Sequence, residues 1–194
     1  MLGNGSVTTW GRADQSLSAS RAEVANQYQL AFRGNPVIVH LGELTMVIRE
    51  MTRQDSLDLL SRTGIGRLAF ARANQPLVVP IFFSHHDDYL YCVSTIGQKI
   101  EWMRENPLIA VEVDEIKDPQ HWESVLVTGQ YEEIANTPET QELRQFAWSL
   151  LQRRKIWWEP GYVETVLGAK PRPNVPLYFR IRMERLTGHR ASNE

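Results

Sequence analysis

The sequence predicts a mainly β protein, a small antiparallel barrel with peripheral helices. Six apolar segments have strand character: Gly66–Arg72, Leu77–Ser84, Tyr89–Ser94, Leu108–Val113, Trp122–Ile134 and Leu177–Glu184. The connectors after the first two are short and polar and leave no room for a crossover helix, so neighbouring strands are expected to be antiparallel. In the fifth segment, Gly129 predicts an irregularity. Two or three helices with one apolar stripe account for the remaining pattern.

The first predicted helix begins after Thr52. Thr52 and Asp55 have the spacing of a capping box, in which a hydroxyl and a carboxylate satisfy free backbone N–H groups at a helix start. Leu57, Leu60 and Leu59 supply the buried stripe, and Gly64 is a typical C-terminal stop.

Two more helices are predicted further along the chain. The first has apolar residues at helical spacing, namely Ile96, Ile100 and Met103. Pro107 ends it, because the residue before a proline is forced out of the helical region. Thr137 is the expected N-cap of the other helix, with Pro138 at its first position. The apolar face of that helix carries Leu143, Phe146, Ala147, Leu150 and Leu151.

Composition divides the chain into three parts. Residues 1–45 are expected to form an N-terminal extension, partly disordered or loosely attached, with a short strand at Pro36–Leu41. The patterned domain covers 46–190, and 191–194 form a C-terminal tail. Met46 stands where the patterned domain begins and offers an alternative start.

The composition of the whole chain is that of a soluble globular protein. Its 194 residues hold 21 Lys and Arg against 23 Asp and Glu, a formal charge of −2, which argues against a nucleic-acid partner. No apolar run approaches the roughly 20 residues of a membrane span, and the N-terminus lacks the layout of a secretory signal. A single cysteine, Cys92, excludes an internal disulfide framework. We therefore expect a cytoplasmic protein without a membrane partner.

Neither a metal site nor a nucleophile is expected. His85, His86, Asp87 and Asp88 are consecutive, so on an extended chain they cannot converge on one ion, and a solvated hairpin turn is predicted instead. Cys92 lies in an apolar stretch where nothing would lower the pKa of its thiol, so it is interpreted as a core residue.

The segment from Ser94 to Lys99 carries the clearest chemical signal. Small hydroxyl residues end a strand, and Lys99 follows in the first turn of a helix. Hydroxyl groups, free N–H groups at a helix N-terminus and a full positive charge can together contact an anion. A capped helix with a solvated lysine explains the same residues equally well.

Two of the six tryptophans, Trp157 and Trp158, are adjacent and fall outside any clear period. A role in the core or in a dimer interface is the default interpretation. An aromatic lid over a planar ligand is the alternative.

Five segments stand in the order found in a known family: Gly66–Ala69, Pro76–Phe83, Leu90–Lys99, Trp122–Gly129 and Phe179–Gly188. They resemble the pyridoxamine 5′-phosphate oxidase-like flavoproteins, nearest the branch that contains the nitroimidazole-resistance proteins. The resemblance covers about 46–190 and implies a six-stranded antiparallel Greek-key split barrel of the FMN-binding type.

The resemblance further implies FMN at the interface of a homodimer. The strand at 78–83 would lie along the flavin through its backbone, and the segment ending at Lys99 would hold the phosphate. Trp122 and Ser124 would reach the flavin from a later strand, which can belong to the other protomer. The implied cofactor-binding residues are Val78, Val79, Pro80, Ile81, Phe82, Ser94, Thr95, Gln98, Lys99, Trp122 and Ser124. Tyr178 and Arg180 are further candidates.

Gln98 departs from the family pattern. Many relatives carry Arg or His at that position, so one charged contact to the phosphate is lost here. In the nitroimidazole branch the residue is often His, which argues against that drug-reducing chemistry in this chain.

The implied activity is that of an FMN-dependent oxidoreductase acting on a small organic substrate, with NADH or NADPH as electron donor. A second interpretation is a non-catalytic binding protein that holds FMN for storage, sensing or regulation. A third is a haem or deazaflavin binder on the same barrel, because a fold alone does not fix a function. No catalytic residue is assigned.

Overall fold

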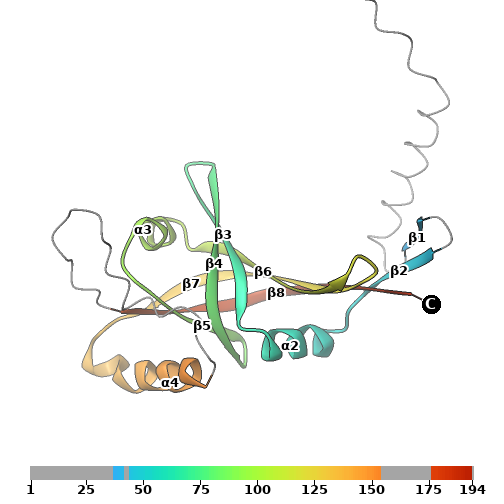
Figure 1. Ribbon diagram of the computed structural model, residues 1–194. Coiled ribbons are helices and arrows are strands. Elements are labelled where there is room, and N and C mark those ends of the chain that lie inside the picture. The colour runs from blue at the N-terminus through green and yellow to red at the C-terminus, as the bar shows by residue number, and fades with distance from the viewer. Residues whose placement is uncertain (1–36, 42–43, 154–175, 194) are drawn as a thin grey trace, which may run out of the picture.

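The computed structural model describes residues 37–41, 44–153 and 176–193 (Figure 1). The elements in chain order are β1 (Val37–Leu41), β2 (Leu44–Glu50), α2 (Arg53–Arg62), β3 (Ile65–Arg72), β4 (Gln75–His86), β5 (Tyr89–Ser94), α3 (Gln98–Glu105), β6 (Leu108–Asp118), β7 (His121–Ile134), a 3-10 turn (Pro138–Thr140), α4 (Gln141–Gln152) and β8 (Leu177–Asn193). Trp157 and Trp158 lie outside the described residues.

Six strands form a closed antiparallel barrel in the order β8–β5–β4–β3–β6–β7, and β7 pairs with β8 to close it. Because β6 returns to the side of β3 instead of β5, the connection is of the Greek-key type. The long β8 pairs with β7 on one edge and with β5 and then β2 on the other. The predicted fold class, a mainly β antiparallel barrel with peripheral helices, is confirmed.

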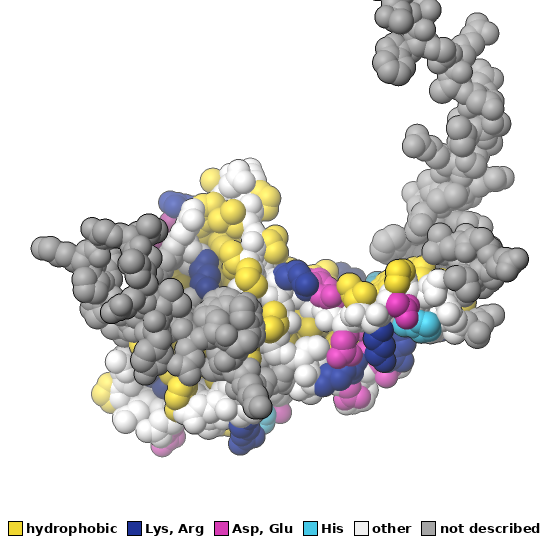
Figure 2. Space-filling model, viewed as in Figure 1, with side chains coloured by type: hydrophobic (Ala, Val, Ile, Leu, Met, Phe, Trp, Pro, Cys, Tyr) yellow, Lys and Arg dark blue, Asp and Glu magenta, His cyan; other side chains and the backbone are white. Residues whose placement is uncertain are grey.

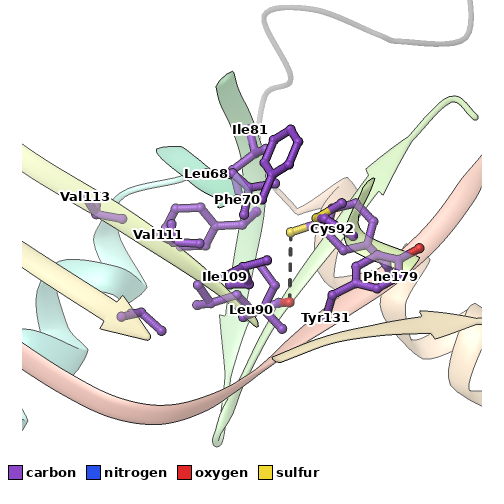
Figure 3. Packing of buried hydrophobic residues seen from close by; sticks show 14 of the residues in the cluster. Leu68, Phe70, Ile81, Leu90, Cys92, Ile109, Val111, Val113, Tyr131 and Phe179 are labelled. Carbon is purple, nitrogen blue, oxygen red and sulfur yellow. Dashed lines mark hydrogen bonds between the residues drawn. The ribbon is translucent and has the colours of Figure 1, made fainter. Parts of the chain in front are cut away.

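The barrel interior is filled by alternate residues of its strands. On β3, Leu68 and Phe70 are buried, while Arg67, which directly precedes Leu68, faces outward. This alternation is the period of a strand. Figure 3 shows Cys92 among these inward side chains. Its thiol lies 3.9 Å from the Leu90 carbonyl, and burial raises the pKa of the Cys92 thiol well above its ordinary value. Cys92 is therefore a core residue, as predicted.

Helix α2 packs across one end of the barrel. Its predicted capping box is present, with the Asp55 N–H donating to Thr52 Oγ1 at 3.1 Å and the Thr52 N–H donating to Asp55 Oδ2 at 3.3 Å. This bonding lowers the pKa of the Asp55 carboxyl. Leu59 and Leu60 are fully buried in the barrel core, so α2 closes that end to water.

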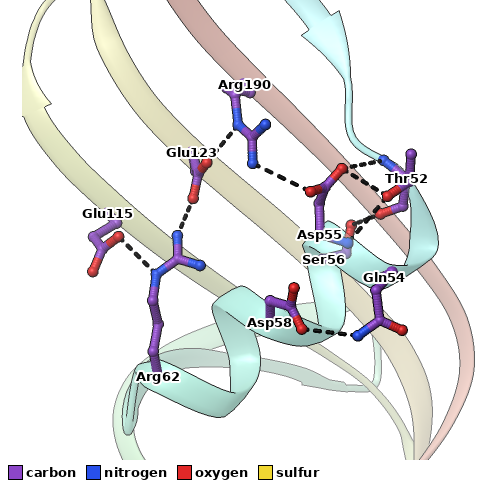
Figure 4. Close-up of polar contacts among 9 residues, drawn as sticks. All are labelled: Thr52, Gln54, Asp55, Ser56, Asp58, Arg62, Glu115, Glu123 and Arg190. Atoms are coloured by element: carbon purple, nitrogen blue, oxygen red, sulfur yellow. Dashed lines mark hydrogen bonds and ion pairs between the residues drawn. The ribbon is translucent and has the colours of Figure 1, made fainter.

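Ion pairs attach the outer side of α2 to the sheet (Figure 4). Arg62 bridges Glu115 of β6 and Glu123 of β7, and Arg190 of β8 bridges Glu123 and Asp55. Single exposed pairs contribute little to stability. Here the pairs form one network that links α2 to β6, β7 and β8. The network therefore helps to fix the orientation of α2 on the barrel.

The other two helices lie against the outside of the barrel. α3 packs on β3, with the Trp102 ring edge-on to Phe70 at 6.0 Å between centroids. α4 forms a second, smaller core with β4, β5, β7 and β8. Its buried members are Tyr91, Ile134, Ala147, Leu150, Leu151 and Tyr178. Phe146 was predicted on the buried face but is 37% exposed, because its ring packs beside His86 and Tyr91 and is not enclosed in the cluster under α4.

The irregularity predicted at Gly129 is a β-bulge between β7 and β8. The register of the two strands shifts between Thr128 and Gly129. A Cβ atom on Gly129 would lie 2.0 Å from the carbonyl oxygen of Arg182, so only glycine fits here. The bulge allows β7 to follow β8 along most of its length.

The ends of the described chain meet beside the barrel. β1 is present where the short strand was predicted in the N-terminal extension, and it pairs with β2. Residues 191–193, assigned to the tail from composition, continue β8 because the backbone of β2 pairs with them. Within the described ranges, no helix is both long enough and apolar enough to cross a membrane.

Candidate functional site

The predicted anion-binding segment connects the end of β5 to the start of α3. Ser94 is buried, and its hydroxyl donates to the Thr95 carbonyl at 3.1 Å. Gly97 is the N-cap of α3 and offers no side chain to bond the first N–H groups. The Gly97 carbonyl accepts from the Ile100 N–H at 2.9 Å, so the backbone N–H groups that precede Ile100 in the helix point away from any intrahelical acceptor.

Lys99 lies in this first turn and is half-buried. Among the residues that the structure describes, its ammonium group has no hydrogen-bond or ion-pair partner. Burial lowers the pKa of the Lys99 ammonium below the ordinary lysine value. A cation removed from water without an acceptor is unfavourable. This environment favours an anion site over a capped helix with a solvated lysine.

The β4 segment expected along a flavin has an open edge. Between Val78 and Phe82, β4 pairs with β3, and its pairing with β5 begins only at Phe83. Its side chains alternate in their surroundings. Val78 and Pro80 are exposed, and Val79 and Ile81 pack in the barrel core. Phe82 packs against the smaller core beneath α4. Pro80 lacks an N–H group, which an unpaired strand edge tolerates. Contacts from this segment to a ligand would therefore be largely through the backbone.

Trp122 and Ser124 lie elsewhere. They share one face of β7 and line a hollow of about 400 Å³. Ser94 pairs with residue 177 of β8, whereas Trp122 pairs with residue 191 of the same strand. At about 3.3 Å per residue, these two positions on β8 are roughly 45 Å apart along the strand. One chain thus brings Ser94, Thr95, Gln98 and Lys99 together at the start of α3, and holds Trp122 and Ser124 near the opposite end of the barrel.

Three charged residues that the sequence analysis did not assign to the site also line the Trp122 hollow: Arg67, Glu112 and Asp114. Arg67 Nη1 lies 3.1 Å from Glu112 Oε2 and also contacts Asp114. The Ser124 hydroxyl donates to Glu112 Oε1 at 2.9 Å. The sequence does mark the two carboxylates, because they interrupt the row of outward-facing residues on β6. The other members of this row, Leu108, Ala110 and Ile116, are apolar.

The outer surface of β3, β4, β6 and β7 carries several exposed apolar side chains. Its exposed apolar side chains, which define the apolar face, are Ile65, Val78, Leu108, Ile116 and Leu126. A second hollow of about 400 Å³ lies on this surface, between Ala69, Pro76, Leu108 and Thr128. Figure 2 shows hydrophobic side chains gathered over the β3–β4 hairpin and the adjoining barrel. Exposed apolar side chains gathered on one face are typical of sites of interaction.

The remaining candidates are engaged in structural contacts. Tyr178 is buried beneath α4, where Arg144 lies 4.8 Å from its ring centroid. The Arg180 guanidinium donates to Glu132 at 2.8 Å and lies 4.1 Å from the centroid of Tyr89. The Arg180 guanidinium is therefore already paired with a carboxylate, unlike the Lys99 ammonium.

The histidine-rich segment forms the hairpin turn that was predicted. β4 ends at His86, and Asp87 adopts a positive φ of 51° in the turn. His85 Nδ1 lies 3.0 Å from Ser61 Oγ, and its Nε2 lies 2.8 Å from the Asp87 carbonyl oxygen. Across the described residues, no three His, Cys, Asp or Glu side chains come together in a way that could hold a metal ion.

A Greek-key barrel with an open strand edge and a candidate anion site at a helix start is typical of a class of ligand-binding β-barrel proteins. Comparison with known families then identifies the particular one. The family model described as pyridoxamine 5′-phosphate oxidase matches residues 52–190. The chain therefore belongs to the pyridoxamine 5′-phosphate oxidase family, and the predicted resemblance is confirmed.

Individual relatives agree with this assignment. The chain is 37% identical over 146 residues to an uncharacterised protein of Rhizobium meliloti (strain 1021), covering 75% of this chain and 97% of that protein. The crystal structure of an FAD-binding protein from Mesorhizobium loti is similar at 36% identity with a TM-score of 0.62, covering 76% of this chain and 98% of the other. A candidate 5-nitroimidazole antibiotic resistance protein of Bacteroides thetaiotaomicron shares the fold at 16% identity and a TM-score of 0.57, covering 82% and 93% of the two chains.

Proposed function

We propose that the protein is an FMN-dependent oxidoreductase that acts on a small organic molecule. The observation that carries this proposal is the half-buried Lys99 ammonium, which has no hydrogen-bond or ion-pair partner in the described chain and lies beside the unbonded N–H groups of α3. Membership of the family and the similarity to an FAD-binding protein support a flavin as the ligand.

The start of α3 fits a phosphate monoester. Such a group carries about −1.5 to −2 charges near neutral pH. Lys99 supplies one full positive charge, and a helix N-terminus adds the equivalent of roughly half a charge together with N–H donors. The half-buried Thr95 provides a hydroxyl donor at the same place. Gln98 is exposed and can donate through its amide without adding charge.

The flavin, when bound, supplies the electron-transfer chemistry. The chain supplies binding and orientation: the phosphate at Lys99, and the open edge of β4 from Val78 to Phe82 for the remainder of the ligand. No residue of the described chain is needed as a nucleophile for this reaction class.

We further infer that a second copy of the chain completes the site. Ligand pockets hold up to about 1,000 Å³, a volume roughly 10 Å across. The β8 partners of Ser94 and Trp122 are separated by roughly 45 Å of strand path, so one such pocket does not reach from the start of α3 to Trp122 within one chain. A partner that packs on the apolar face would bring its own Trp122 and Ser124 toward the first chain's β4 edge. Homodimers with a two-fold axis are the commonest oligomers, and they form two equal sites in this way.

The visible absorption spectrum of the freshly purified protein tests the cofactor. Twin flavin bands are expected, and heat release followed by chromatography should give FMN. Released FAD would keep the flavin but overturn the choice of FMN. A colourless protein that also fails to take up added FMN would overturn the proposal as a whole.

Turnover requires a separate measurement. Oxidation of NADH or NADPH by the FMN-loaded protein, followed with and without an added acceptor, should exceed the rate of free FMN. Bound FMN without such a rate would favour a protein that stores, senses or delivers the flavin.

A further inference from the structure

The hollow beside Trp122 contains a hydrogen-bond arrangement whose polarity is fixed. Ser124 donates its hydroxyl proton to Glu112 Oε1 at 2.9 Å. A serine hydroxyl has one proton, so once this proton is donated the oxygen can only accept further hydrogen bonds. In the part of the chain that the structure describes, no donor is bonded to Ser124 Oγ. Its free lone pairs therefore remain available to a ligand.

Arg67 keeps Glu112 in the acceptor state that this arrangement needs. Arg67 Nη1 donates to Glu112 Oε2 at 3.1 Å and also contacts Asp114. The charge of Asp114, with that of Glu112, raises the pKa of the Arg67 guanidinium. With one oxygen on a permanent cation and the other on Ser124, the Glu112 carboxylate is held as a double acceptor.

Backbone register explains why these groups meet. Arg67 of β3 stands directly opposite Glu112 of β6, and Asp114 of β6 stands opposite Ser124 of β7. Glu112 and Ser124 are therefore diagonal neighbours on the outward face of the sheet, within reach of each other. Trp122, two residues before Ser124, lies on the same face, and its indole N–H has no partner among the described residues.

We propose that Glu112 is a positioning residue that makes Ser124 a hydrogen-bond acceptor for a ring N–H group of the bound flavin. The oxidised isoalloxazine has a single ring N–H, at N3, between two carbonyl oxygens. An acceptor from Ser124 suits that N–H, and the donor of Trp122 suits a neighbouring carbonyl. This inference rests on the proposed function, in which the partner's hollow faces the flavin.

The test compares FMN with 3-methyl-FMN, in which a methyl group replaces the N3 proton. The full-length protein, freed of endogenous flavin, is titrated with each and the flavin fluorescence is followed. Wild-type protein should bind FMN roughly 10-fold more tightly, because the methyl analogue leaves the Ser124 acceptor unpaired. Ser124→Ala should bring the two affinities close together.

Glu112→Gln is the decisive variant because it preserves size. The amide oxygen must stay on Arg67, so the amide NH₂ faces Ser124 and turns its hydroxyl into a donor toward the ligand. The preference for FMN should then disappear. Glu115→Gln is the matched control: Glu115 lies on the same strand but bonds Arg62 at 3.0 Å, and its substitution should leave the preference unchanged.

The outcomes separate the two proposals. A preference that persists in Glu112→Gln would show that the methyl group is excluded by its size, and would overturn the role of Glu112. Equal losses for both flavins would indicate a structural role only and would overturn it as well. Wild-type protein that binds neither flavin would overturn the proposed function itself, and this inference with it.

Discussion

Lys99 is the residue on which the proposed phosphate site depends most. We expect Lys99→Ala to weaken FMN binding by roughly 10- to 100-fold, because a charged hydrogen bond to a phosphate contributes about 1.5–3 kcal/mol. Fluorescence titration measures this effect. Lys117→Ala removes an exposed lysine from β6 and serves as the control with unchanged affinity. Equal affinity of Lys99→Ala and wild type would remove Lys99 from the site.

The pKa of Lys99 makes a second prediction, on pH. Because burial lowers this pKa, the folded protein loses the Lys99 proton at a lower pH than the unfolded chain does. FMN affinity should therefore fall as the pH rises, and the fall should begin at a lower pH than that at which an ordinary lysine titrates. The free energy of unfolding of the flavin-free protein should rise as the pH rises through the same range. The reason is that burial penalises the charged ammonium, and this penalty is relieved when the proton leaves.

Lys99→Arg checks that sign. A guanidinium stays charged throughout this range, so the arginine variant should bind FMN with little dependence on pH. If its affinity falls in parallel with that of wild type, the pH dependence arises from another group, such as the flavin itself.

At the level of elements, the β7–β8 pairing depends on the bulge at Gly129. Gly129→Ala places a Cβ 2.0 Å from the Arg182 carbonyl oxygen, so the two strands must separate locally. We expect a loss of about 2 kcal/mol or more in the free energy of unfolding, measured by urea denaturation. Gly97→Ala is the matched control, because nothing lies within 4 Å of a Cβ there. It should cost less than about 1 kcal/mol, and similar losses for both variants would contradict the role of the bulge.

Elements with local signals were predicted well from the sequence. The capping box at Thr52, the turn at Asp87 and the bulge at Gly129 each follow from the chemistry of a few neighbouring residues. The full length of β8 could not be predicted in this way. Its residues beyond Glu184 lose the apolar alternation of a strand and are held in place by pairing with β7 and β2. Phe146 was misplaced for a related reason: helical spacing predicts a stripe, but the width of the covered stripe depends on what packs against α4.

At the scale of the whole molecule, the predicted site divides into two parts. The start of α3 could be found in the sequence because hydroxyls, a helix start and a lysine are adjacent. Arg67, Glu112 and Asp114 could not be combined in the same way, because they come from two strands whose register only the folded barrel establishes. Likewise, only the closed barrel shows that Trp122 lies far from Lys99, which is the reason to propose a second copy.

The apolar face provides the last prediction, which concerns the dimer. Leu108 is 61% exposed and Ile116 is 68% exposed, so each leaves apolar surface in water that a symmetric partner would cover. Leu108→Glu should fold normally, because the side chain makes little contact within its own chain. In a two-fold dimer the new charge enters the interface twice, so light scattering should show wild type as a dimer and the variant as a monomer.

Flavin binding should fail together with dimerisation. The monomeric Leu108→Glu variant keeps Lys99 but lacks the partner's Trp122 and Ser124, so its affinity for FMN should fall although the proposed phosphate site is intact. Gln145→Glu adds the same charge on α4, away from the apolar face, and should change neither property. A variant that stays dimeric would show that the partner packs elsewhere. A monomer that binds FMN as tightly as wild type would show that one chain holds the whole flavin, and the open edge of β4 would then be the place to look for its remaining contacts.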